Sequence, residues 1–338
     1  MRRKVSGDTK LPGNWNDFLR DPINKKELFE FLSSKVADCS IPPECSVYIT
    51  AGEHVTCVGT QIEMSSCNQE ETDTRIVVHV KHALENGAKS IQVRTVDTDV
   101  VVVLIGVFHD LSQINADLDL WVAFGTGKNY THYSINAICA HLGERKSCSL
   151  PVFHSLSGCD TTSAFRGKGK KSFWQAWNAY EEVTDAFVHL AAHPFEHLDL
   201  HSESFQRIER LVVVVYDKTS NAMNVNSARM ELFSQKRQAV DKIPPTQNAL
   251  LQHTRRAVYQ AGIWTTCMLS QQTNPCPTDY AWVKVGNSWE PVWSTIPEAS
   301  KACREFVKCG CKRACTVCKC SKANLPCTSL CRCTCSSK

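Results

Sequence analysis

Nine cysteines are concentrated between positions 309 and 335 of this 338-residue chain, in the pattern C-x-C-x3-C-x2-C-x-C-x6-C-x3-C-x-C-x-C. The segment has few large apolar side chains, so disulfides or bound metal must supply its folding free energy. The C-x-C pairs bring two thiolates too close for an unstrained mutual disulfide, but place them well to share an ion. Because zinc takes four ligands, nine thiolates fill about three sites if three sulfurs bridge. The predicted ligands are Cys309, Cys311, Cys315, Cys318, Cys320, Cys327, Cys331, Cys333 and Cys335.

The alternative for such a segment is a disulfide-bonded region of a secreted protein. The chain begins Met1-Arg2-Arg3-Lys4 and continues with polar residues, which is not the pattern of a hydrophobic signal peptide. The apolar run at residues 100–107 is too short to span a bilayer and is interrupted by Gly106. We therefore expect a nuclear or cytoplasmic protein that is neither secreted nor embedded in a membrane.

The C-terminal segment is also strongly basic. Residues 301–338 contain nine lysines and arginines and a single acid, whereas the whole chain has a net charge of only +4. A compact basic unit of this kind predicts binding to DNA or RNA. The alternative is that these cations only offset the negative charge of the thiolates. No motif for a small-molecule cofactor is evident. The basic residues between the cysteines are the candidate contacts: Lys312, Arg313, Lys319 and Lys322.

The cysteine spacing has a counterpart in a known module. The run from Cys318 to Thr328, CKCSKANLPCT, resembles the CXC (tesmin/TSO1-like) module, and the similarity covers roughly residues 303–335. In that module nine cysteines hold three zinc ions. The resemblance therefore implies a small zinc-stapled unit at this end of the chain.

Hydrophobic periodicity and turn residues divide the chain into four expected parts. These are an N-terminal helix and linker (1–45), an α/β core (46–180), a helical and tryptophan-rich extension (181–300) and the cysteine-rich module (301–338). We expect strands at 47–50 and 91–95, a hairpin of 121–124 with 130–133, and either strand or helix at 100–107. This order predicts a mostly parallel sheet. The expected helices are 24–32, 70–86, 135–142, 172–180, 205–215 and 249–268, the second capped near Ser65, Ser66 or Asn68.

Three acidic motifs have the composition of a site for a hard divalent cation. Residues 70–75 read EETDTR at the start of an expected helix, residues 95–99 read TVDTD after a β-rich stretch, and residues 158–163 read GCDTTS. Acids that follow the strands of an open α/β sheet gather at its carboxyl edge, and carboxylate oxygens are the ligands that Mg²⁺ and Mn²⁺ prefer. The candidates are Glu71, Asp73, Asp97, Asp99 and Asp160.

Helix geometry separates the acids of the first motif. At about 100° per residue, Asp73 falls on the apolar face of its helix, where an acid is costly unless it is paired or binds metal. Glu71 lies about 160° away and joins Asp73 only from the helix cap or a frayed first turn. Glu70 is the rival ligand. The alternative is that the acids of these motifs only cap helices and occupy solvated first turns.

The order and spacing of the three motifs resemble the internal region of flap-endonuclease and XPG-like 5′ nucleases, over roughly residues 66–180. There an E-x-E pair opens a helix, a D-x-D pair ends the next strand, and a G-x-D-Y motif precedes a glycine-rich helix–two-turn–helix. The chain is also similar to a large animal family with E-E-A-D-T-R and G-C-D-T-x-S-A-F-x-G-K-G-K signatures and a cysteine-rich tail. The resemblance implies a PIN-like fold, a Mg²⁺ or Mn²⁺ site, and a turn that holds the nucleic-acid backbone. That turn comprises Arg166, Gly167, Lys168, Gly169, Lys170 and Lys171.

Two features depart from the 5′-nuclease pattern. Thr161 stands where that family has a tyrosine after the aspartate. The family also takes two further aspartates from the region before the E-x-E helix, and here the aspartates of that region end no expected strand: Asp8, Asp17, Asp21 and Asp38. We therefore predict a nucleic-acid-binding protein related to metal-dependent 5′ nucleases, as a truncated or degenerate copy with little or no nuclease activity. The alternatives are an active structure-specific nuclease and a protein-interaction scaffold.

Overall fold

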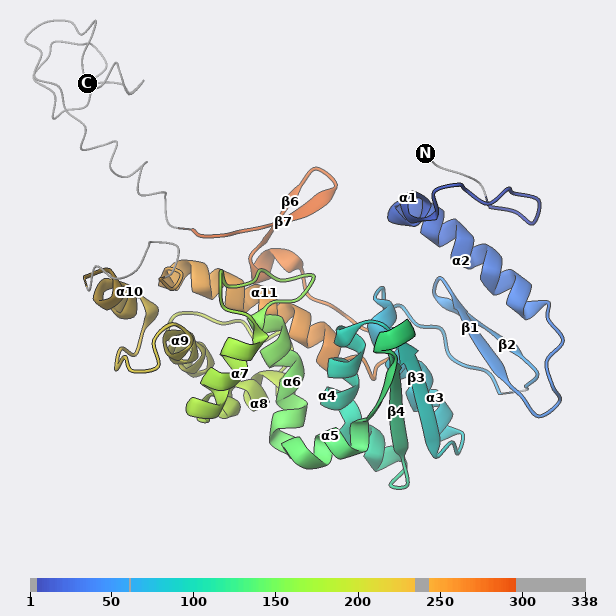
Figure 1. The fold of residues 1–338 in the computed structure, drawn as a ribbon, viewed down its shortest axis with the longest axis horizontal. Coiled ribbons are helices and arrows are strands. Elements are labelled where there is room, and N and C mark those ends of the chain that lie inside the picture. The colour runs from blue at the N-terminus through green and yellow to red at the C-terminus, as the bar shows by residue number, and fades with distance from the viewer. Residues whose placement is uncertain (1–4, 61, 235–242, 296–338) are drawn as a thin grey trace, which may run out of the picture.

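The computed structural model describes residues 5–60, 62–234 and 243–295, which form a mixed α/β fold of small sheets and many helices (Figure 1). The predicted zinc ligands and the basic residues between them lie outside the described residues. At one end of the molecule are two helices and a hairpin, where one helix and one strand were expected. These elements are α1 (Trp15–Arg20), α2 (Pro22–Ala37), β1 (Val47–Ala51) and β2 (His54–Val58).

The central sheet has three strands in the order β3-β4-β5. Strand β3 (Ser90–Thr95) pairs in parallel with β4 (Asp119–Phe124), and β4 pairs antiparallel with β5 (Thr131–Ser134). The expected hairpin is confirmed, but the expectation of a mostly parallel sheet holds for only one of the two strand pairs. The reason is the turn after β4: Gly125 adopts a φ of 82°, and the chain reverses at once instead of crossing over through a helix.

The crossover between the two parallel strands is α4 (Thr98–Ile114). This settles the ambiguous run 100–107 as helix, because parallel strands need a long connection. The helix packs against α3 (Thr72–Glu85), and both contribute to the first hydrophobic core, formed with β3, β4 and α5 (Ile135–Leu142). The expected cap of α3 was wrong: its N-cap is Glu71.

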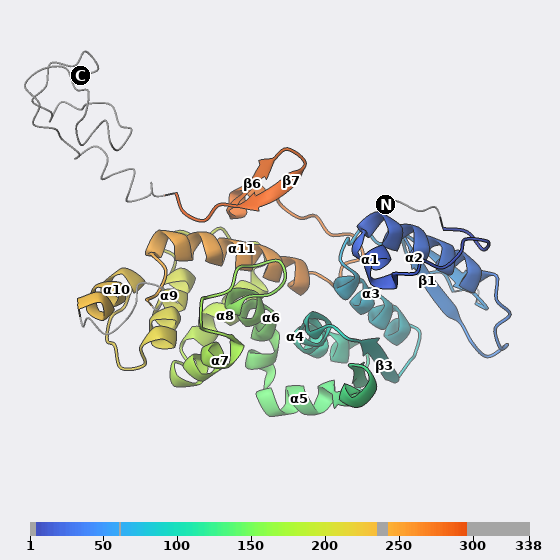
Figure 2. The ribbon, with the colours of Figure 1, turned by 45° about the horizontal axis from the view of Figure 1, so that its top comes forward.

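A second core is formed almost entirely by helices and lies at the other end of the molecule (Figure 2). Residue 180, where a boundary was expected, falls between helices that share this core. Its helices are α6 (Glu144–Ser157), α7 (Lys170–Ala179), α8 (Val183–Ala192), α9 (Glu203–Tyr216), α10 (Val225–Ser234) and α11 (Gln247–Thr265).

Helices α6 and α11 join the two cores. Trp264 near the end of α11 is buried in the first core, while the preceding turns of α11 pack in the second. Helix α6 contacts both α4 and α8. The approach of α6 to α4 is close because Gly106 has no side chain: a Cβ there would lie 2.5 Å from Cγ of Pro151. The two cores are therefore coupled through tightly packed helices.

The tryptophan-rich region, expected as a loop, contains a short helix and a hairpin. The 3-10 helix η3 (Pro277–Tyr280) leads into β6 (Trp282–Val285), which pairs antiparallel with β7 (Ser288–Pro291). The hairpin stands out from the body of the molecule beside α11 (Figure 1). Among the described residues, none of the helices combines the length and the apolar character that a membrane span requires.

Candidate metal and nucleic-acid site

Three aspartates from the first two acidic motifs converge in the structure. One carboxylate oxygen of each of Asp73, Asp97 and Asp99 lies within 4.8 Å of the others. Asp73 is in the first turn of α3, whereas the other two stand where β3 ends and α4 begins. This is the spacing of ligand atoms around a single small cation, and oxygen donors suit Mg²⁺ or Mn²⁺. The prediction that these three acids converge is confirmed, and a cation bound by them stays a prediction.

Helix N-termini position the three carboxylates. Asp97 caps α4, and its side chain accepts a hydrogen bond of 2.9 Å from the backbone N–H of Asp99. The capping alternative is therefore also correct for Asp97, which caps a helix and joins the cluster. The positive ends of the α3 and α4 dipoles favour negative charge at this point. Two helix starts thus offset part of the repulsion among the acids.

The acids of the cluster differ in their affinity for protons. Burial, together with the charges of Asp97 and Asp99, raises the pKa of Asp73 to about 6. Asp99 has its pKa lowered, first by a hydrogen bond of 2.9 Å from Nε2 of His154, against the opposing effect of burial. We therefore assign the negative charge firmly to Asp99, and the proton that the cluster takes up near pH 6 to Asp73. A bound cation would displace that proton.

Glu71 lies beside the cluster but is held by other partners. As the N-cap of α3 it occupies the position that would let it join Asp73. Its carboxylate instead accepts hydrogen bonds of 3.2 Å from Nε2 of Gln260 and from Nε1 of Trp264. Burial raises the pKa of Glu71, and these two hydrogen bonds oppose the rise. Glu71 thus forms one wall of the site and is not among the three acids within 4.8 Å.

The third motif comes close to the cluster without completing it. Asp160 is exposed and lies outside the group of three, although its charge contributes to raising the pKa of Asp73, after burial and the nearer acids. The next residue, Thr161, donates a hydrogen bond of 2.8 Å to Oε1 of Gln260, the residue that also holds Glu71. Gln260 therefore links the loop after α6 to the start of α3. Asp160 stands at the rim of the site.

The basic side chains of the predicted backbone-binding turn have different neighbours in the structure. The Lys170 ammonium group donates to the carbonyl oxygen of Gly158 and is close enough for Asp99 and Asp160 to raise its pKa, although burial, the larger effect, lowers it. Lys168 instead lies over the ring of Tyr216, 5.1 Å from its centroid. Lys170 thus faces the acids and Lys168 the second core. Arg166, Gly167, Gly169 and Lys171 are exposed.

Three residues of the site escaped the sequence analysis: His154, Gln260 and Trp264. Each is at most 5% exposed and lies in a helix that contains none of the acidic motifs. Their only sequence signal is a polar or amphipathic side chain on a helix that is buried on most sides. Such positions are recognisable only when the facing element is known.

The aspartates of the first 45 residues do not stand at strand ends, where the 5′-nuclease pattern places its two further ligands. Asp17 lies within α1, Asp21 caps the start of α2, and Asp38 follows its end. Asp8 lies in a turn. As expected, none of them ends a β-strand.

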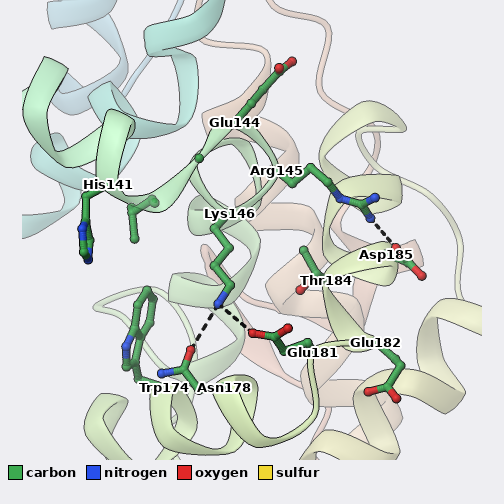
Figure 3. Close-up of a pocket in the computed structure, with 12 residues that line it drawn as sticks. His141, Glu144, Arg145, Lys146, Trp174, Asn178, Glu181, Glu182, Thr184 and Asp185 are labelled. Atoms are coloured by element: carbon green, nitrogen blue, oxygen red, sulfur yellow. Dashed lines mark hydrogen bonds and ion pairs between the residues drawn. The ribbon is translucent and has the colours of Figure 1, made fainter.

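The structure has a further cleft away from the aspartate cluster. This cleft, of about 770 Å³, lies between the start of α6 and residues of α7 and α8, and charged side chains of both signs line it (Figure 3). There Lys146 bonds to Asn178 and lies 3.5 Å from Glu181, and Arg145 is paired with Asp185. The lysine and the arginine of this cleft are already paired, so we place the functional site at the aspartate cluster, where three carboxylates converge.

Comparisons of the chain with protein-family models, with curated proteins and with solved structures find no match.

Proposed function

We propose that this protein binds nucleic acid through a divalent cation held by Asp73, Asp97 and Asp99, and that it is related to the metal-dependent 5′ nucleases. The observation that supports the proposal most directly is the approach of three carboxylates to within 4.8 Å, from two helices that start 26 residues apart. The placement of two of these acids directly after a parallel strand supports a PIN-like relationship. The bound cation would supply a positive charge for a phosphodiester oxygen.

The surrounding residues prepare the site for a phosphate group. His154 holds one carboxylate in place through its hydrogen bond to Asp99. The Lys170 ammonium group beside the cluster adds a positive charge that the acids alone would lack. Helix α7 begins at this lysine, so its N-terminus adds a favourable field for an anion. Carboxylates, cation and ammonium group together would hold a phosphodiester at this edge of the sheet.

Hydrolysis of the bound phosphodiester is the second candidate function. It is favoured by Glu71 and Asp160, which extend the acidic surface beyond the first three carboxylates. A second cation about 4 Å from the first would require these acids as ligands. The carboxylate of Glu71 is already engaged by Gln260 and Trp264. We therefore propose that nucleic-acid binding dominates and that cleavage is weak.

The proposal can be tested by titrating the full-length protein with Mn²⁺ and following free Mn²⁺ by electron paramagnetic resonance. Asp99→Asn removes the charge of the carboxylate that His154 orients and should weaken Mn²⁺ binding by tenfold or more. Asp117→Asn is the matched control, because Asp117 is an exposed acid paired with Lys89. Equal Mn²⁺ affinities for the two variants would refute a metal site at this cluster.

Nucleic-acid binding and cleavage need a separate measurement. Fluorescence anisotropy with single-stranded, flapped and duplex DNA should show tighter binding with Ca²⁺ than without added divalent cation, and Asp99→Asn should remove that difference. Strong Mg²⁺-dependent cleavage that Asp99→Asn abolishes would establish the nuclease instead. Absence of binding to every substrate would favour the protein-interaction scaffold.

A further inference from the structure

The β6–β7 hairpin presents two indole rings and a lysine on one face. In its register, Lys284 lies opposite Trp289, and Trp282 lies opposite Pro291. Cross-strand partners share a face, and residues two apart on one strand do as well. Trp282, Lys284 and Trp289 therefore project together, and the Lys284 ammonium group lies 5.9 Å from the centroid of the Trp289 ring. Val283 and Val285 belong to the opposite face.

This face borders a cleft that also contains the acids beside the aspartate cluster. Both tryptophans line a cavity of about 520 Å³ together with Tyr259 of α11, and Glu71 and Asp160 belong to the same lining. Trp289 is 42% exposed, so its ring has a free surface. The cleft thus joins aromatic rings to the rim of the proposed cation site.

The base of the hairpin, next to Trp282, is anchored to α11. Arg256 of α11 is 2% exposed, and its guanidinium donates hydrogen bonds of 3.4 Å to the carbonyl oxygen of Ala281 and 2.7 Å to that of Val292. The same group lies 5.9 Å from the centroid of the Trp282 ring. The backbone N–H of Val292 also donates to Ala281, at 2.8 Å. A buried cation and a closed hairpin base therefore hold the Trp282 ring in position over the cleft.

We propose that Trp282, Lys284 and Trp289 form a stacking subsite for an unpaired nucleobase of a single-stranded nucleic acid whose backbone reaches the aspartate cluster. This inference rests on the proposed function and names the class of its substrate. Indole rings stack on bases of any sequence, and a lysine beside them pairs with phosphate. The exposed Asn274 side chain in the same cleft offers an amide group to base edges. A fully paired duplex exposes no base faces along its length, so the subsite selects single strands.

Aromatic rings beside acids also form cages for methylated ammonium groups. Two observations favour the nucleobase. Lys284 puts a positive charge at the rings, which repels an ammonium ligand and attracts a phosphate. Glu71 directs its carboxylate toward Gln260 and Trp264, so it is not free to face a cation in the cleft.

The test measures binding of fluorescein-labelled single-stranded oligothymidylate to the full-length protein in Ca²⁺, by anisotropy. Trp289→Ala should weaken binding about tenfold, since stacking of one base is worth about 1–3 kcal/mol. Trp289→Phe, which keeps an aromatic ring, should stay within about threefold of the wild type. Val285→Ala is the matched control on the opposite face of the hairpin and should have no effect. For a blunt duplex of equal length, Trp289→Ala should change the affinity less than twofold.

The outcomes separate the subsite from the function on which it rests. If Trp289→Ala binds single strands as tightly as Val285→Ala while Asp99→Asn binds them weakly, the subsite is refuted and the cation site stands. If the wild-type protein binds no single strand, both fail. Binding of a trimethyl-lysine peptide that is lost in Trp289→Ala, with oligothymidylate binding unchanged, would replace the nucleobase by a methylammonium ligand. Thermal unfolding followed by circular dichroism checks that each variant is folded.

Discussion

At the scale of single residues, two buried histidines hold the loop that follows α6. His154 bonds to Asp99 and so ties the helix to the aspartate cluster. Nε2 of His253 donates a hydrogen bond of 2.7 Å to the carbonyl oxygen of Leu156, and its Nδ1 accepts one of 2.7 Å from Oγ of Ser163. Both ends of the loop that carries Asp160 are therefore fixed by imidazole groups.

Acid should weaken the fold through His253. Burial lowers its pKa to about 4, from an ordinary value of 6.5. Between these two values the unfolded chain binds a proton that the folded protein does not, so stability is full above pH 6.5 and falls as the pH decreases toward 4. From pH 7 to pH 5 the contribution of His253 to the free energy of unfolding should fall by about 2 kcal/mol.

Urea unfolding at pH 7 and pH 5 measures this loss. His253→Gln keeps a donor for Leu156 but does not titrate, so between pH 7 and pH 5 the wild type should lose about 2 kcal/mol more of its free energy of unfolding than the variant does. Asp73, with its raised pKa, acts in the opposite direction, but equally in both proteins. The same pH dependence in the variant would contradict the assignment.

His154 should matter for metal binding although it is not a ligand. Partners of metal ligands are typically worth about 10–100-fold in metal affinity, because they orient the ligand. We expect His154→Ala to weaken Mn²⁺ binding about tenfold and His154→Asn to recover part of it. His141→Gln, at an exposed histidine of α5, is the control. A Mn²⁺ affinity in His154→Ala equal to that of this control would show that the hydrogen bond does not position Asp99.

At the scale of secondary-structure elements, the contact of α4 with α6 sets the geometry of the site. Asp99 lies in the first turn of α4, and His154 lies near the end of α6. The two helices touch where Gly106 faces Pro151. A proline inside α6 has no backbone N–H to donate, and its ring fills the space left by the missing side chain.

Gly106→Ala should therefore destabilise the protein, although alanine is the better helix former. The new Cβ would lie 2.5 Å from Cγ and 2.9 Å from Cδ of Pro151, a rigid ring that cannot turn away. We expect a loss of about 1–3 kcal/mol in the free energy of unfolding. Gly13→Ala meets no atom within 4 Å and is the control. If the two variants unfold at the same urea concentration, α4 and α6 are not in tight contact.

At the scale of the whole molecule, two hydrophobic cores meet along α6 and α11, and the aspartate cluster lies near their junction. The nine cysteines among the described residues are all free. The zinc ions expected at the C-terminal cysteines stay a prediction.

Elemental analysis of the full-length protein should give about three zinc ions per chain, because nine thiolates with three bridging sulfurs satisfy three tetrahedral sites. One zinc or none, together with titratable disulfides, would contradict the zinc cluster.

The affinity for DNA should fall steeply between low and moderate salt, since cations released from phosphates drive the binding. Neutralising Lys312, Arg313, Lys319 and Lys322 together should flatten this salt dependence. An unchanged slope would locate DNA binding away from the C-terminal segment.

Several elements could be predicted from local sequence, and others could not. The helix ending before Gly87, the strand at 91–95 and the hairpin around Gly125 all follow from periodicity and glycine positions. The run 100–107 stayed ambiguous because a fully apolar stretch has no period. Only its place between two parallel strands makes it a helix.

The sequence by itself indicated the three acids that converge, because Asp97 and Asp99 follow a strand and Asp73 faces the core, and both are local properties. It also indicated Glu71 and Asp160, which do not join them. The tertiary structure alone decided how these acids are used. In the folded protein Glu71 accepts hydrogen bonds from Gln260 and Trp264, and Asp160 lies at the rim of the site. The hairpin residues Trp282 and Trp289 line the same cleft as these two acids. The residues concerned are separated by about 190 positions, as in the bond of Gln260 to Glu71. No local pattern encodes such contacts, because they arise only when distant helices pack together.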